Sequence, residues 1–237
     1  GVEVVYLLTP QLPESVEYVR AAVAAARTSG VQRIVRQSVF NAADGADGIA
    51  RWHREAEELI GSSGLRYTFV RANAFMQNFA TIYRPSIVER DTFSLPLGEA
   101  RLSNVDARDV AAAATALLLD DEFDGSVSTL TGPEALGGEE MARALTGVTG
   151  RLIRYRDEPE DEGTPAGPVD AAHVAERDAL RELGAEMRAG RLSAVTDDVA
   201  RLTGRQPLSF EQFARDHAWA FSRHPYAQDE SEGVSYG

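Results

Sequence analysis

The sequence predicts an α/β protein built around a parallel β-sheet with helices on both faces. Three segments typical of strands, at residues 2–8, 31–38 and 65–70, alternate with two amphipathic helical patterns, and the first is rich in β-branched and aliphatic residues. A strand, a helix and a second strand in this succession are typical of a parallel crossover unit, because parallel strands need a long connection. A chain of 237 residues has room for one large domain or for a core with a smaller lobe.

The two helices between these strands are predicted from apolar spacing and from their ends. Residues 13–15 open a pattern with valines and an alanine at helical spacing, and Gly30 closes it, as glycine commonly does at a helix C-terminus. A Gly/Asp/Ala loop at residues 41–48 precedes the second helix, which we expect over residues 49–60. Because the strands alternate with helices, as in doubly wound folds, we expect a parallel sheet that is covered on both faces.

Beyond the third strand the pattern is less regular. We expect a helix over residues 75–83, a hairpin over residues 92–105 and a helix over residues 110–119. Asp106 and Asp109 stand where an N-cap and an acid in the first turn would stabilise the last of these helices. We therefore expect a structural role for both carboxylates.

Further short elements continue the alternation, with a strand at residues 127–130, a helix at residues 139–145 and a strand at residues 151–156. Residues 157–170 are rich in Pro, Gly and acids, which favours a loop, and a helical tail is expected over residues 171–221. We therefore predict a sheet-and-helix core at residues 1–156 and a smaller α-rich lobe at residues 157–237, whose last residues are expected to be disordered.

The composition excludes several classes of function. With 24 Lys and Arg against 37 Asp and Glu, the net charge of −13 repels phosphate polymers and anionic membranes, so nucleic-acid binding is not expected. The absence of cysteine excludes thiolate metal sites, and His173, His217 and His224 have no metal-ligand spacing, so no metal is expected. No apolar run approaches the ~20 residues that span a bilayer, and no signal-peptide pattern opens the chain. We therefore expect a cytoplasmic protein.

Six groups of residues, spread in order along the chain, form a pattern that is weak in each part and specific as a whole. They are VQRIVRQS at 31–38, WHREAE at 52–57 with SGLRYTFVR at 63–71, NAFMQNF at 73–79, VDARDVA at 105–111, LTGPE at 130–134, and LTGRQP at 202–207 with FEQF at 210–213. Together they resemble the NmrA-like family of atypical short-chain dehydrogenases/reductases, which includes azo-dye, quinone and triphenylmethane reductases. The resemblance implies a Rossmann-like fold and either NADP or NAD as the cofactor.

The resemblance also shows what this sequence lacks. Members of the family begin with a strand, a G-x-x-G-x-x-G turn and a helix, whose backbone N–H groups hold the cofactor's pyrophosphate. Here residues 2–10 are similar to the fourth strand of that sheet, and Gly147 and Gly150 end a helix instead of forming a phosphate loop. The implied Rossmann-like core is therefore partial, short of two βαβ steps of roughly 60–75 residues, and we expect the chain to be truncated or degenerate.

Ser38 and His53 are the candidate catalytic residues. His53 matches the position where related reductases carry a His or Lys at the substrate, and an imidazole can hydrogen-bond or protonate a heteroatom as hydride arrives. The plain alternative is a histidine on a helix surface. Ser38 ends a parallel strand, where ligands bind in open α/β sheets, although its hydroxyl can equally satisfy a nearby amide. His53 and Glu57 replace the tyrosine and lysine of ordinary short-chain dehydrogenases, so a phenolate base is not expected.

Two further groups of binding residues follow from the resemblance. Thr9, Pro10 and Gln11, with Ser38, are expected to line the cofactor groove. Phe75, Met76 and Asn78 are expected to face the substrate, since an aromatic ring and a thioether suit flat conjugated acceptors. The alternative for Phe75 and Met76 is a place in the core.

The sequence thus favours an NAD(P)H-dependent reductase of the NmrA-like type acting on a quinone, azo or other conjugated small molecule. Two alternatives stay open: a non-catalytic redox-sensing or binding protein, and a cofactor-independent enzyme that reuses the substrate pocket. A Ser–His hydrolase using Ser38 and His53 is disfavoured because the serine lacks a G-x-S-x-G turn. A partial sheet leaves its first strand unpaired, so we also expect self-association, into a homo-oligomer or by aggregation.

Overall fold

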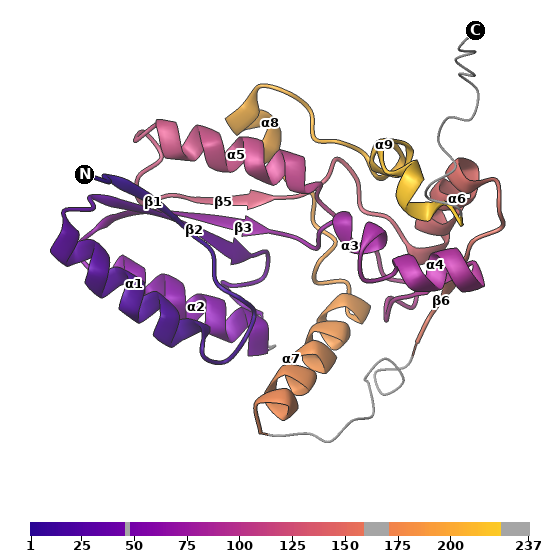
Figure 1. Ribbon diagram of the computed structural model, residues 1–237, viewed down its shortest axis with the longest axis horizontal. Helices are drawn as coiled ribbons and strands as arrows, with labels where there is room; N and C mark the ends of the chain where they lie inside the picture. Colours follow the sequence, from indigo (N-terminus) through magenta and orange to yellow (C-terminus); the bar gives the residue numbers. More distant parts are fainter. Residues whose placement is uncertain (46–47, 159–170, 224–237) are drawn as a thin grey trace, which may run out of the picture.

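The computed structural model describes residues 1–45, 48–158 and 171–223. Its centre is a four-stranded sheet in the order β1-β2-β3-β5, with every neighbouring pair parallel (Figure 1). The strands are β1 (Val4–Leu7), β2 (Arg33–Val39), β3 (Arg66–Ala72) and β5 (Val127–Leu130). The predicted parallel α/β architecture is confirmed.

Helices cover both faces of this sheet. Helices α1 (Ser15–Ser29) and α2 (Gly48–Gly61) pack on one face, and α5 (Ala107–Leu119) and α8 (Asp198–Thr203) lie over the other (Figure 1). Successive strand residues point to opposite faces, so Ile34 joins the cluster under α1 and α2 while Val35 joins the cluster under α5. Both residues are buried, at 1% and 0% exposure, so β2 is covered on both of its faces although it also carries polar side chains such as Arg36.

The predicted helix ends are largely confirmed. Gly30 adopts a left-handed conformation (φ 83°) and closes α1. The carboxylate of Asp106 caps α5 by accepting a hydrogen bond from the backbone N–H of Arg108 at 2.8 Å. Asp109 lies in the first turn of α5, as expected, but its buried carboxylate also binds the C-terminal part of the chain. It accepts a hydrogen bond from the N–H of Leu208 at 2.7 Å and pairs with Nη1 of Arg205 at 2.6 Å.

A second core lies beyond the carboxyl ends of the strands. It is formed by α3 (Gln77–Ala80), α4 (Arg84–Arg90), β4 (Thr92–Ser94), α6 (Gly138–Thr149), β6 (Arg154–Arg156), α9 (Phe210–Asp216) and the 3₁₀ helix η1 (Ala218–Phe221). Its centre is aromatic. The ring of Phe79 meets the rings of Phe93 and Phe210 edge to face, with centroids 5.1 and 4.8 Å apart. The predicted helix over residues 75–83 is therefore real but shorter, because Phe75 instead forms a bridge with Val105.

The predicted hairpin over residues 92–105 is wrong. Its first part, β4, pairs in parallel with β6, and Leu102 bridges to Leu136. The apolar residues of this segment, Leu95 and Leu97, are buried at 4% and 0% exposure in the second core. Burial of these leucines stabilises a path of the segment through the second core in place of a hairpin. Its strand partners lie far away in the sequence.

The chain returns to the sheet after α7 (Ala171–Arg188), which packs against α2. The backbone N–H of Thr129 in β5 donates to Oδ2 of Asp198 at 2.6 Å, and the carbonyl of Thr129 accepts from the hydroxyl of Thr196. These contacts cover the outer edge of β5, and α8 then packs on α5. The division of the chain at residue 156 stays a prediction. No helix within the described ranges is long and apolar enough to cross a bilayer.

Two glycines of α6 give a matched test of this packing. A Cβ on Gly138 would lie 2.4–2.5 Å from ring atoms of Tyr155, whereas a Cβ on Gly147 would meet nothing within 4 Å. We expect Gly138→Ala to lower the free energy of unfolding by about 1–3 kcal/mol through overpacking. Gly147→Ala should raise it by about 0.5–1 kcal/mol, because alanine is the better helix former. Urea denaturation measures both, and equal effects of the two substitutions would contradict the packing described for Tyr155.

Candidate active site

A cluster of polar side chains lies between the sheet and α2, toward the carboxyl ends of the strands. Arg36 and Ser38 are two residues apart on β2 and therefore share one face. Ser38 stands opposite Arg71 of β3 in the register of the sheet. His53 and Glu57 are four residues apart on α2, one turn of helix, and both are buried. Carboxyl ends of parallel strands are where open α/β sheets bind ligands.

Arg36 is the centre of this cluster. Its side chain is 0% exposed. One guanidinium nitrogen, Nη1, donates to the carbonyl of Leu7 at 3.3 Å. The other, Nη2, donates to Oγ1 of Thr9 at 2.9 Å and lies 3.5 Å from Nδ1 of His53. Arg36 therefore joins the end of β1 to α2 through one buried cation.

A carboxylate on α2, that of Glu57, partly balances the positive charge of Arg36. Glu57 forms two hydrogen bonds with Arg71, from Nε at 3.0 Å and from Nη2 at 2.5 Å, and only 6% of the Glu57 side chain is exposed. Burial lowers the pKa of Arg36 to about 10, while the nearby charges of Glu57 and Tyr6 act in the opposite direction. The guanidinium therefore stays protonated at neutral pH. The result is an alternating set of charges, Arg36, Glu57 and Arg71, under the strand ends.

His53 is neutral in this environment. The ring is 3% exposed, and burial lowers its pKa to about 3, with the positive charge of Arg36 acting in the same direction. Its second nitrogen, Nε2, has no hydrogen-bond partner among the described residues, and neither has the hydroxyl of Ser38, which is 1% exposed. Buried polar atoms are nearly always paired in proteins. Because these two unpaired atoms also lie near the carboxyl ends of parallel strands, this layer is the candidate ligand site.

The low pKa of His53 predicts a dependence of stability on pH. Because the pKa in the folded protein lies below the ordinary value of 6.5, the unfolded chain takes up a proton that the folded chain does not, and stability falls as the pH falls through 6.5. We expect a loss of about 2 kcal/mol from His53 between about pH 8 and pH 5, above the range where carboxylates titrate. Thermal unfolding of the wild type and of His53→Gln measures this. An equal slope in the two proteins would exclude His53 as its cause.

The structure gathers some of the predicted site residues and separates others. Thr9 is 7% exposed and bound to Arg36, and the exposed residues Pro10 and Gln11 follow it in the loop after β1. Phe75 packs with the α5 layer, on the opposite face of the sheet from His53. Met76 is 1% exposed in the second core.

Asn78 in α3 is half-buried, and its side-chain carboxamide has no hydrogen bond among the described residues, while its backbone N–H donates to the carbonyl of Phe75. Thr9 and His53 thus contact Arg36, and Ser38 lies on the same face of β2, whereas Phe75 and Met76 belong to other clusters. The substrate role of Phe75, Met76 and Asn78 stays a prediction.

Two polar residues of the NAFMQNF segment form hydrogen bonds that join distant parts of the chain. The amide nitrogen of Asn73 donates to Oγ of Ser103 at 2.7 Å and to the carbonyl of Leu192 at 2.9 Å. Gln77 donates to Oδ1 of Asp106 at 2.9 Å and accepts from the N–H of Ala107 at the same distance. These bonds hold the start of α5 and the C-terminal part of the chain against the end of β3.

Arg36 and Arg71 are the functional candidates that the sequence prediction missed. A signal was present, since an arginine within a strand buried on both faces must find a partner in the interior. The identity of that partner was not visible, because the contacts join strand residues to a helix 17 and 14 positions away in sequence.

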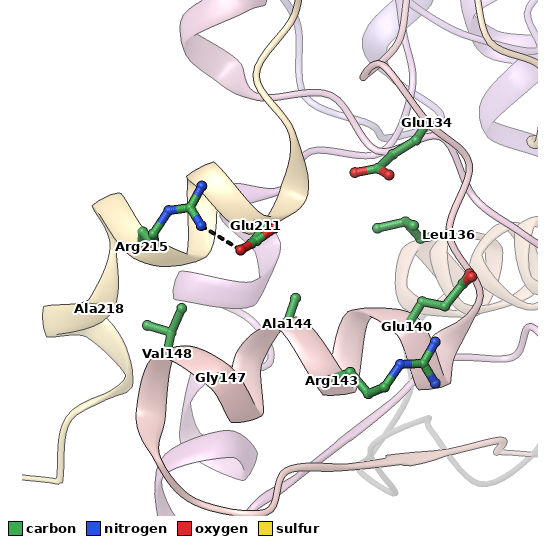
Figure 2. Close-up of a pocket in the computed structure, with 10 residues that line it drawn as sticks. All are labelled: Glu134, Leu136, Glu140, Arg143, Ala144, Gly147, Val148, Glu211, Arg215 and Ala218. Carbon is green, nitrogen blue, oxygen red and sulfur yellow. Dashed lines mark hydrogen bonds and ion pairs between the residues drawn. The ribbon is translucent and has the colours of Figure 1, made fainter.

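A separate groove lies between α6 and α9, with a volume of ≈ 590 Å³ (Figure 2). Val148 contributes an apolar side chain, Arg143 and Glu140 stand along α6, and Glu211 pairs with Arg215 on α9. None of the predicted site residues lines this groove. Within the described ranges no group of three or more His, Asp or Glu residues is placed to hold a metal ion.

Comparison with known proteins adds sequence relatives and solved structures. The model of the NmrA-like family matches residues 1–175. An NAD(P)H azoreductase of Xenophilus azovorans is 36% identical over 222 residues, 93% of this chain and 77% of that protein. A (4-alkanoyl-5-oxo-2,5-dihydrofuran-3-yl)methyl phosphate reductase of Streptomyces griseus is 34% identical over 234 residues, 94% of this chain and 78% of that protein.

Among solved structures, the NADPH-dependent quinone oxidoreductase of Escherichia coli in complex with NADPH superposes with a TM-score of 0.79 over 91% of this chain and 76% of its own. Its sequence identity to this chain is 23%, so this likeness establishes the fold.

Proposed function

The chain belongs to the NmrA-like family, and on that basis we propose that it is an NAD(P)H-dependent reductase of a quinone, azo or other conjugated small molecule. The azoreductase relative supports the reaction class. The observation that carries the proposal is the pair of buried, unpartnered polar atoms at the strand ends, Nε2 of His53 and Oγ of Ser38. A ligand that brings hydrogen-bonding atoms to this edge would satisfy both.

The residues of this chain fit one end of a nicotinamide cofactor. The unpaired hydroxyl of Ser38 ends β2, where a carboxamide or an acceptor oxygen could take its hydrogen bond. The pyrophosphate has no assigned position, because the sequence contains no G-x-x-G-x-x-G turn. NADP and NAD both remain compatible with the nicotinamide end.

A bound reduced nicotinamide would supply the hydride for a two-electron reduction of the acceptor, which a proton from water would complete. His53 and Ser38 would donate hydrogen bonds to the acceptor heteroatom on which negative charge develops. A neutral His53 is a hydrogen-bond donor in this step and not the source of the proton. A phenolate base of the Tyr–Lys type is absent by composition, since all 24 basic residues are arginine.

The test is consumption of cofactor by the purified chain. NADPH and NADH are each mixed with the protein and a panel of quinones and azo dyes, and the loss of reduced-cofactor absorbance is followed with and without each acceptor. We expect acceptor-dependent oxidation of at least one cofactor and a rise in Tm when that cofactor is present. No oxidation with any acceptor, together with no change in Tm, would reject the proposal.

We further propose that the chain self-associates, because among the described residues no strand pairs with the outer edge of β1. β1 is a terminal strand of the sheet, while the opposite edge at β5 is covered by Thr196 and Asp198. An uncovered edge strand is a template for pairing with another chain. Light scattering should therefore give a mass above that of one chain, rising with concentration. A monodisperse monomer at all concentrations would contradict this.

A further inference from the structure

The contact with Arg36 allows the neutral His53 ring only one tautomer. A guanidinium has donors and no acceptor, so the nitrogen that faces it must offer a lone pair. Nη2 of Arg36 lies 3.5 Å from Nδ1 of His53. Nδ1 is then unprotonated, and the single proton of the neutral ring sits on Nε2.

The position of the guanidinium is itself fixed. The carbonyl of Leu7 and the hydroxyl of Thr9, both at the end of β1, accept its hydrogen bonds at 3.3 and 2.9 Å. Because Arg36 is 0% exposed, it cannot turn toward water. The end of β1 therefore fixes the position of the Arg36 guanidinium, and the guanidinium determines which nitrogen of the His53 ring carries the proton.

The other groups around the ring do not compete for Nδ1. The charged side chains on the elements packed around α2 include Glu57, Arg51 and Arg54 of α2 itself, Arg71 of β3 and Glu182 of α7. Arg51 contacts Glu182 and Arg54 donates to the carbonyl of Ala43, while Tyr6 of β1 belongs to the cluster on the opposite face of the sheet. The hydroxyl of Tyr6 donates to Gln37, Glu57 is bound to Arg71, and Glu182 accepts from the N–H of Gly48 at 2.7 Å. Helix α1 presents Val19 and Val23 to the same interface.

We propose that Arg36 is a positioning residue that holds His53 as a neutral ring protonated on Nε2, so that the unpaired nitrogen is always a hydrogen-bond donor. The further step, that this N–H donates a hydrogen bond to a bound acceptor, rests on the proposed function. The state of the ring does not rest on it, because the contacts that fix it lie within the chain.

The experiment is NMR of the isotope-labelled histidine ring nitrogens, with the His53 signals assigned by their absence in His53→Gln. In the wild type we expect a single neutral tautomer, protonated on Nε2, from about pH 8 to about pH 5. In Arg36→Met, which keeps a long side chain, we expect mixed tautomers and a His53 pKa higher by at least about one unit. A wild-type ring protonated on Nδ1 overturns the proposal, whether or not any variant folds.

A smaller substitution tests the same contact in case Arg36→Met does not fold. Thr9→Val removes the hydroxyl that anchors Arg36 and should shift the tautomer ratio in the same direction, by less than Arg36→Met. Thr68→Val is the matched control, because Thr68 is also buried and its hydroxyl bonds to the carbonyl of Phe123 at the far end of the sheet. The control should leave the His53 signals unchanged. Folded Arg36→Met and Thr9→Val proteins that both keep the wild-type signals would refute the role of Arg36.

The two proposals fail separately. The ring signals require neither cofactor nor acceptor, so an inactive protein with the expected tautomer would reject the reductase and retain the role of Arg36. If the protein is active, the pH profile of kcat should show no inflection from His53 in the wild type and gain one in Arg36→Met, with a smaller change in KM. A merely structural role of Arg36 would lower the amount of folded protein and leave that profile unchanged.

Discussion

Replacing Arg71 with methionine is expected to lower the free energy of unfolding by about 3 kcal/mol. The substitution leaves the carboxylate of Glu57 buried, at 6% side-chain exposure, without its two hydrogen bonds. Breaking a buried ion pair from one side typically costs about 3–5 kcal/mol. We expect the lower end because Arg36 still offsets part of the negative charge. Urea denaturation followed by circular dichroism measures the loss.

Two comparisons isolate the cause. Arg66→Met changes the same residue type on the same strand, but 45% of the Arg66 side chain is exposed and its ion pairs with Asp121 and Asp124 lie at the surface. Its cost should stay below about 1 kcal/mol. The double variant Glu57→Met with Arg71→Met also removes the unpaired carboxylate of Glu57, so it should recover much of the lost free energy of unfolding. Equal losses in Arg66→Met and Arg71→Met, or no recovery in the double variant, would contradict this account.

Replacing His53 with leucine is expected to lower kcat by about 10²-fold, the usual cost of removing one hydrogen-bond donor from developing negative charge. Leucine has no donor at the position of Nε2, whereas glutamine can place its amide N–H close to that position. His53→Gln should therefore keep kcat within roughly tenfold of the wild type. Steady-state rates with the best acceptor of the panel measure both variants.

A histidine outside the cluster provides the control. His217 follows α9 and contacts the carbonyl of Phe213 through Nδ1, far along the chain from the strand ends. His217→Leu should leave kcat unchanged. If His53→Leu retains wild-type activity while the wild type is an active reductase, His53 is not part of the active site. If His53→Gln is as impaired as His53→Leu, proton transfer by the imidazole would replace hydrogen bonding as its role.

The architecture was predictable because its signals are local. Segments with valine and isoleucine, such as residues 31–38, have strand propensity, and glycine at position 30 ends the helix before them with a left-handed turn. The hairpin prediction failed because strand pairing is decided over long distances. Residues 92–94 carry strand propensity, but their partner lies at residues 154–156, and nothing within the segment specifies it.

The candidate site was predictable only in part. Strand ends and the family pattern point to Ser38 and His53, and the structure places both in one buried layer, while their functional role stays a prediction. The dependence of His53 on Arg36 could not be read from the sequence. It arises because β2 and α2 pack with a particular rotation, which brings a strand residue to Nδ1 and leaves Nε2 unpaired.

The bond between Asp109 and the N–H of Leu208 spans 99 residues of sequence. During synthesis, Asp109 leaves the ribosome well before its partners, and at about 5–20 residues per second the delay is on the order of 5–20 s. Over that interval the start of α5 carries a carboxylate that must stay hydrated, so this helix cannot settle fully onto the sheet. The nascent protein therefore has a late closing step, and a ribosome-stalled chain ending before Arg205 should be more sensitive to protease at α5 than the released one.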